Sequence, residues 1–164
     1  MLRAATGLSP GAIGALVAVS GVGGACAMLF NGWHSDLKRE RYLHLAAPLA
    51  IQAAAFAVMA FTHSPPAFAA AYLVLIAANF AVAAVFWLAP GEMLDPRSVA
   101  VAVAAINGLG QLGSFAMPYA WGLARDATGD FHAGMLALIA PYLIAVGIVL
   151  VLRQEHRRRL RAAA

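Results

Sequence analysis

The stretch Ala105 to Tyr119, AINGLGQLGSFAMPY, lies inside a long apolar run but carries two amides, Asn107 and Gln111. The whole run, residues 98–123, contains no Asp, Glu, Lys or Arg. About 20 apolar residues in a helix cross the ~30 Å hydrocarbon core of a bilayer, so the run predicts a transmembrane helix. An amide facing lipid would have no hydrogen-bond partner, which is costly. We therefore expect both amides to face other protein or a water-filled cavity.

Further stretches of similar length lack charged residues. Hydrophobic residues make up 63% of the 164-residue chain and charged residues 11%, too little polar surface for a soluble domain. Alternation with a period of two, as in barrel strands, is missing, so helices must satisfy the backbone. The predicted fold class is all-α integral membrane with five transmembrane helices. The predicted organisation is an extracytoplasmic segment 1–10, a membrane domain 11–152 with helices 11–33, 43–62, 67–89, 98–123 and 133–152, and a basic tail 153–164.

The amide-bearing run presents its polar residues on one side. Asn107, Gln111, Ser114 and Pro118 follow a spacing of four, three and four residues, which places them on one face of a helix. The amides can either bond neighbouring helices or line a cavity and bind substrate. Helix packing and bending are the roles expected of the small or kinking residues in this run: Gly108, Gly110, Gly113 and Pro118.

Basic residues predict the orientation. They gather after the first and third runs and in the tail, whereas Arg3 and Arg125 fall on the other side. The positive-inside rule then places the N-terminus outside and the C-terminus in the cytoplasm. The tail is expected to be solvated and to meet anionic headgroups. A cleaved signal peptide is the alternative for the first run, but its apolar residues continue through Phe30 to Trp33, which is long for such a peptide.

Catalytic and metal-binding patterns are missing from the sequence. It contains no HExxH, GxSxG, Walker or Rossmann pattern, and Cys26 is its one cysteine. His34 and Asp36 are expected to be solvated in a basic loop rather than to bind metal. No aromatic and basic face accompanies the positive charge, so nucleic acid is not an expected partner. We expect no enzymatic activity, no cofactor and no metal.

Three segments resemble parts of major facilitator superfamily transporters, in the form found in the anion:cation symporter branch. GWHSDLKRERYLH, residues 32–44, resembles the cytoplasmic G-x-x-x-D-R-x-G-R-R loop between helices eight and nine. FWLAPGEML, residues 86–94, resembles the end of the tenth helix. INGLGQLGSFAMPYAWGLARDATGDF, residues 106–131, resembles the eleventh helix and following turn, with departures at Gln111, Ser114 and Met117.

The resemblance implies that the chain is helices eight to twelve of a twelve-helix carrier, a truncated C-terminal part that lacks an N-terminal half of six or seven helices. Such carriers of a bacterial-type inner membrane couple protons to uptake of small organic anions, such as sugar acids or other carboxylates, by alternating access. A coupling carboxylate would belong to the missing part, since the five runs contain none. The alternative is a small stand-alone membrane scaffold that transports nothing itself.

The resemblance also implies residue roles. Asn107 would contact substrate, with Gln111 equally suited to either role, and the Trp87 indole would line the cavity unless it is an interfacial anchor. Weaker candidates for the substrate site are Phe86 and Asn79. The loop motif, with Gly32 and Asp36, would control conformation, because Asp36 would meet the positive start of the eleventh helix near Ser98. Asp36 is otherwise a solvated acid beside Lys38. Its expected charge partners are Glu40 and Arg41.

Overall fold

The computed structural model describes residues 2–129 and 132–162, so Asp130 and Phe131, which end the third resembling segment, lie outside the described residues. Within the described part, every regular element is a helix. The elements are α1 (Leu2–Thr6), α2 (Pro10–Lys38), α3 (Tyr42–Phe61), α4 (Pro65–Phe86), α5 (Ala89–Met93), α6 (Pro96–Thr128) and α7 (His132–Ala162). Helices α2, α3, α4, α6 and α7 are long and apolar enough to cross a membrane, so the predicted all-α membrane fold class is confirmed.

The helices differ from the predicted ranges mainly at their ends. Helix α2 continues five residues past residue 33 to Lys38, and α7 continues through the basic tail to Ala162. Helix α4 stops at Phe86, and the separate short helix α5 follows with Pro90 in its first turn, because a proline cannot continue the hydrogen-bond ladder of α4. The short helix α1 falls in the segment that we expected to precede the membrane domain.

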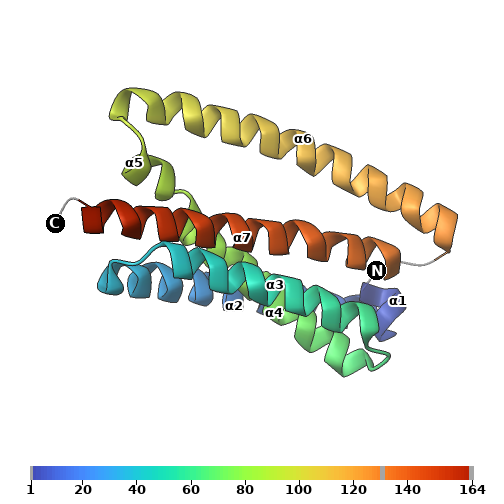
Figure 1. Ribbon diagram of the computed structural model, residues 1–164. Coiled ribbons are helices and arrows are strands. Elements are labelled where there is room, and N and C mark those ends of the chain that lie inside the picture. Colours follow the sequence, from blue (N-terminus) through green and yellow to red (C-terminus); the bar gives the residue numbers. More distant parts are fainter. Residues whose placement is uncertain (1, 130–131, 163–164) are drawn as a thin grey trace.

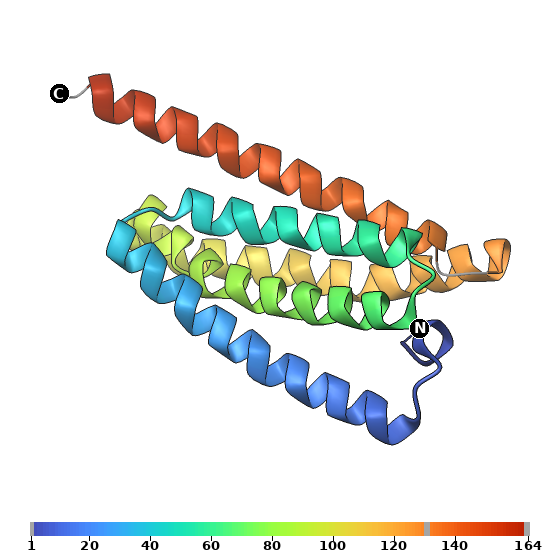
Figure 2. The ribbon, with the colours of Figure 1, turned by 90° about the horizontal axis from the view of Figure 1, so that it is seen from below.

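Three helix pairs form the packed part of the molecule. Helix α4 lies between α2 and α3 (Figure 2), and α7 packs along the other side of α3. The core between α3, α4 and α7 is built from aromatic, methionine and small side chains: Ala55, Phe56, Met59, Ala60, Phe68, Ala71, Leu75 and Met135. Helices α2 and α3 scarcely touch each other, so they diverge from the loop that joins them.

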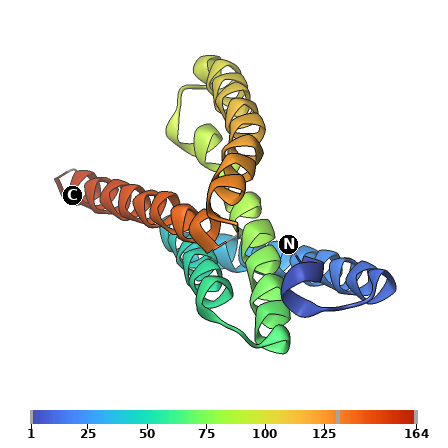
Figure 3. The same cartoon turned by 90° about the vertical axis from the view of Figure 1, so that its right-hand side faces the viewer.

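Helix α6 meets this core near its C-terminal end, where Trp121 packs against it, and most of the rest of the helix is exposed. No residue of the most apolar 18-residue stretch of α6 is buried. Figure 3 shows α6 projecting away from α2, α3 and α4. A Cβ atom added at Gly108, Gly110 or Gly113 would meet no atom within 4 Å. The described part of the chain therefore supplies no packing partner for these glycines. The helix runs unbroken through Pro118, and the packing and kink roles expected of this group stay predictions.

The basic segments gather at one end of the molecule. In Figure 1, the α2–α3 loop, the start of α6 and the C-terminal end of α7 lie at the same end, whereas α1, the α3–α4 connection, the C-terminal end of α6 and the start of α7 lie at the other. Lys38, Arg39, Arg41 and Arg97 thus share an end with the arginines of α7. This arrangement agrees with alternating crossings of the five long helices.

Candidate functional site

The amide face of α6 carries the residues that we expected to bind substrate. Asn107, Gln111 and Ser114 are exposed. Among residues 2–129 and 132–162, neither amide has a hydrogen-bond partner. Because such groups cannot stay unpaired at membrane depth, another polypeptide segment, water or a bound solute must satisfy them. Bonding to another of the described helices therefore does not explain these amides.

The other predicted substrate residues lie on and after α4, which does not touch α6. Trp87 follows the end of α4, is 45% exposed and meets Phe86 edge to face with ring centroids 5.1 Å apart. The Asn79 side-chain nitrogen donates a 3.5 Å hydrogen bond to Gln52 Oε1 of α3. The structure thus holds the five predicted residues in two separate groups. Their common role in a substrate site stays a prediction.

Gln52 is a polar residue of α3 that the sequence analysis missed. It is 1% exposed, and its amide nitrogen donates to the Pro48 carbonyl at 3.5 Å while its oxygen accepts from Asn79. The available signal was an amide inside an uncharged run, which is the signal that drew attention to Asn107. Within the bundle, Gln52 therefore bonds helix to helix.

The α2–α3 loop positions Asp36 against Arg41. Arg41 Nη1 lies 2.5 Å from Asp36 Oδ1 and 3.1 Å from the hydroxyl of Ser35, which is fully buried. The Ser35 hydroxyl donates to the Glu40 carbonyl at 3.0 Å. Helices α2 and α6 do not touch, so the described chain does not make the expected contact between Asp36 and the helix start near Ser98. The pair with Arg41 anchors the loop at the end of α2 instead.

Two backbone features shape this loop. Arg39 ends α2 in the left-handed region, with φ 49° and ψ 40°. In the loop pattern that this segment resembles, glycine stands at that position, and glycine adopts the left-handed region without steric cost. Gly32, one turn before Asp36, faces α4, where a Cβ would meet the Ala84 Cβ at 3.6 Å. Arg39 thus holds a left-handed conformation, which residues with a side chain rarely adopt, where the pattern has glycine.

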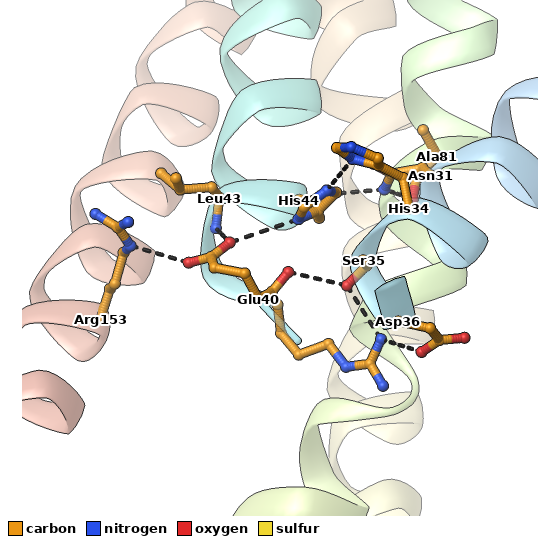
Figure 4. Close-up of polar contacts among 10 residues, drawn as sticks. Asn31, His34, Ser35, Asp36, Glu40, Leu43, His44, Ala81 and Arg153 are labelled. Carbon is orange, nitrogen blue, oxygen red and sulfur yellow. Dashed lines mark hydrogen bonds and ion pairs between the residues drawn. The ribbon is translucent and has the colours of Figure 1, made fainter. Parts of the chain in front are cut away.

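Glu40 connects the α2–α3 loop, in which it lies, with α3 and α7, as Figure 4 shows. Its Oε1 accepts a 2.9 Å hydrogen bond from Arg153 Nε of α7. Its Oε2 accepts from the Leu43 backbone N–H at 2.7 Å, which satisfies a donor in the first turn of α3, and lies 3.5 Å from His44 Nδ1. Glu40 is therefore a partner of Arg153 rather than of Asp36, and the expectation that it pairs with Asp36 is wrong in this structure. The bond between Glu40 of the α2–α3 loop and Arg153 of α7 spans 113 positions of sequence.

Asn31 and two histidines tie α2 to α3. The Asn31 amide donates to the His44 carbonyl at 2.9 Å and to the Ala81 carbonyl of α4 at 2.8 Å. The His44 carbonyl accepts this bond because Pro48, four residues later, has no N–H to offer it. His34 Nδ1 lies 2.7 Å from His44 Nε2, so the expectation that His34 is solvated beside Asp36 is wrong. Within the described residues, no group of three or more His, Cys, Asp or Glu side chains could hold a metal ion.

The hydrogen bonds of Asn31 lead to a prediction about stability. Replacing Asn31 by alanine is expected to lower the free energy of unfolding by about 1–2 kcal/mol, because two carbonyls at membrane depth lose a donor. The measurement is thermal unfolding in detergent, followed by tryptophan fluorescence. In a Pro48→Ala background the new N–H can bond the His44 carbonyl, so the same substitution should cost less. Equal losses in both backgrounds would contradict the role of Pro48.

Comparison with known proteins shows that the chain is similar to proteins named as transporters. It is 30% identical over 147 residues to a quinolone resistance transporter of Acinetobacter baumannii, covering 90% of this chain and 34% of that protein. Two putative tartrate transporters of Agrobacterium vitis are also 30% identical, over 91% and 87% of this chain and 33% of each relative. No family model matches the sequence, and no solved structure is similar to it.

The chain spans about a third of the length of these relatives. All three are named transporters rather than enzymes, which agrees with the five membrane-length helices. The class that sequence and fold support is therefore membrane transport in a lipid bilayer.

Proposed function

We propose that this chain is the C-terminal section, helices eight to twelve, of a proton-coupled major facilitator symporter for small organic anions, and that it works by alternating access. The observation that carries the proposal is the amide face of α6, which has no hydrogen-bond partner among the described residues. About 90% of the chain is similar to about a third of the length of each named transporter. The two tartrate-transporter names support a dicarboxylate or sugar acid as substrate. The remaining section would supply the opposite wall of the cavity.

The proposal assigns roles to both groups of predicted residues. Asn107 and Gln111 donate hydrogen bonds to the carboxylate or hydroxyl oxygens of the substrate. Trp87 adds an indole N–H and an apolar wall, with Phe86 against it and Asn79 about two turns earlier on α4. The proton-binding carboxylate and an anion-binding cation come from the remaining section, because the five spans of this chain contain no charged residue. The C-terminus lies in the cytoplasm, since the basic end of the molecule then faces inward.

Complementation tests the proposal directly. The chain is expressed together with, or fused to, the part of an Agrobacterium vitis tartrate relative that it does not match. We expect uptake of labelled tartrate in cells that make both pieces, a loss of that uptake with a protonophore, and no uptake with either piece alone. Labelled norfloxacin in the same cells tests the substrate class of the quinolone relative.

The outcome that overturns the proposal is specific. If both pieces reach the membrane and copurify, yet neither solute accumulates, the chain is not a working section of such a carrier. The stand-alone scaffold would then remain, and it would form a stable membrane assembly without the second piece.

A further inference from the structure

An open groove of about 470 Å³ lies where α2 and α3 diverge over α4. Its walls are apolar, with Ala27 and Phe30 from α2, Ala47 and Ile51 from α3, and Val74 and Ala77 from α4. Its polar lining residues, Asn31 and His44, lie at the end toward the α2–α3 loop, where they are already bonded to other protein groups. The groove thus offers an apolar channel that begins near the membrane surface.

Unpaired cations follow directly beyond this end of the groove. Lys38 and Arg39 are exposed, and among the described residues no carboxylate pairs with either of them. The nearby acids are engaged, since Asp36 binds Arg41 and Glu40 binds Arg153. The first predicted span ends at residue 33. Lys38 lies five residues further along α2, a rise of about 7 Å along the helix axis. That distance matches the headgroup layer, about 5–8 Å thick on each side of the core.

We propose that the α2–α3 groove binds one acyl chain of an anionic phospholipid, whose phosphate is held by Lys38 and Arg39. Apolar walls at the depth of the acyl chains, followed by free cations at the depth of the phosphates, fit a lipid along its whole length. A transmembrane helix would match the walls but would not use two cations at the headgroup level. The site lies away from the amide face of α6, so it goes beyond the proposed transport function and does not depend on it.

The test uses the purified chain in detergent, titrated with phosphatidylglycerol or phosphatidylcholine. Native mass spectrometry counts bound lipids, and tryptophan fluorescence follows thermal unfolding. We expect one phosphatidylglycerol to remain bound and to raise the unfolding temperature. Ala27→Phe fills the groove and should abolish this binding, whereas Ala25→Phe places the same ring on the opposite face of α2 and should leave it intact. Ala47→Phe, at an exposed position of α3, fills the groove from the other wall if Ala27→Phe fails to fold.

Charge variants test the phosphate contact. Lys38→Gln with Arg39→Gln should reduce the preference for phosphatidylglycerol over phosphatidylcholine by about tenfold. Arg157→Gln with Arg158→Gln, which removes two exposed tail cations, should leave the preference unchanged. Equal binding of the two lipids, binding that survives Ala27→Phe and Ala47→Phe, or a preference that only the tail variant removes would each overturn the site. Loss of the lipid when the chain is joined to the remaining transporter section would show instead that a protein segment occupies the groove.

Discussion

Alanine at position 107 is expected to lower tartrate uptake by about tenfold or more in the assembled carrier. Asn107 is exposed on a membrane-length helix and has no hydrogen-bond partner within the described chain, so its amide is available to a solute. A hydrogen bond to a charged group contributes about 1.5–3 kcal/mol, and 1.4 kcal/mol corresponds to a tenfold change. The measurement is the initial rate of labelled tartrate uptake at equal amounts of protein in the membrane.

Leu109→Ala is the matched control for this prediction. Leu109 lies two residues further along α6, on the face opposite Asn107, and is 71% exposed. Its truncation should leave uptake close to that of the parent carrier. If Asn107→Ala transports normally, or if both variants lose activity to the same degree, the assignment of the amide face to the substrate site is wrong.

Leucine at position 24 is expected to disrupt the packing of α2 on α4. Gly24 is buried, and a Cβ there would lie 2.9 Å from Cγ and Cδ2 of Phe80. These atoms lie at the base of the ring, where it is bonded to the Phe80 Cβ. The ring or the helices must therefore shift, and overpacking of this kind costs about 1–3 kcal/mol. We expect a clear fall in unfolding temperature and a smaller yield of folded protein in detergent.

Gly23 provides the comparison for this second variant. It precedes Gly24 on the same helix, but a Cβ at Gly23 would meet no atom within 4 Å. Gly23→Leu should therefore unfold near the temperature of the parent chain. Equal destabilisation by both leucines would indicate that helix propensity or membrane insertion, rather than the contact with Phe80, controls the effect.

The fold class could be predicted because, in a membrane, the sequence of each segment decides its own secondary structure. Each long uncharged run had to become a helix, because lipid offers the backbone no other partner within a single segment. Helix ends were predicted less well. Helix α4 separates from α5 where Pro90 cannot continue the hydrogen-bond ladder, and α7 continues as a helix through the basic tail, although hydropathy alone predicts an end at residue 152.

The polar network near the loop was harder to predict. Asn31 and His34 come from α2, and His44 and Gln52 from α3. Nothing in their local sequence distinguishes a solvated side chain from a bonded one. Glu40 illustrates the difficulty, since its position suggested a partner in its own loop but the packing of α7 on α3 brings Arg153 to it instead. Partners distant in sequence depend on helix packing, which the sequence pattern does not reveal.

The sequence by itself determined that the chain is a bundle of membrane-length helices with a basic end, because hydropathy and charge act residue by residue. It also determined that Asn107 and Gln111 share a face, since helix periodicity alone places them there. Only the tertiary structure decided which polar groups are satisfied within the chain. Asn31 finds partners because α2 packs on α4, and Gln52 because α3 packs on α4. The amides of α6 find none among the described residues, because no described helix covers the polar face of α6.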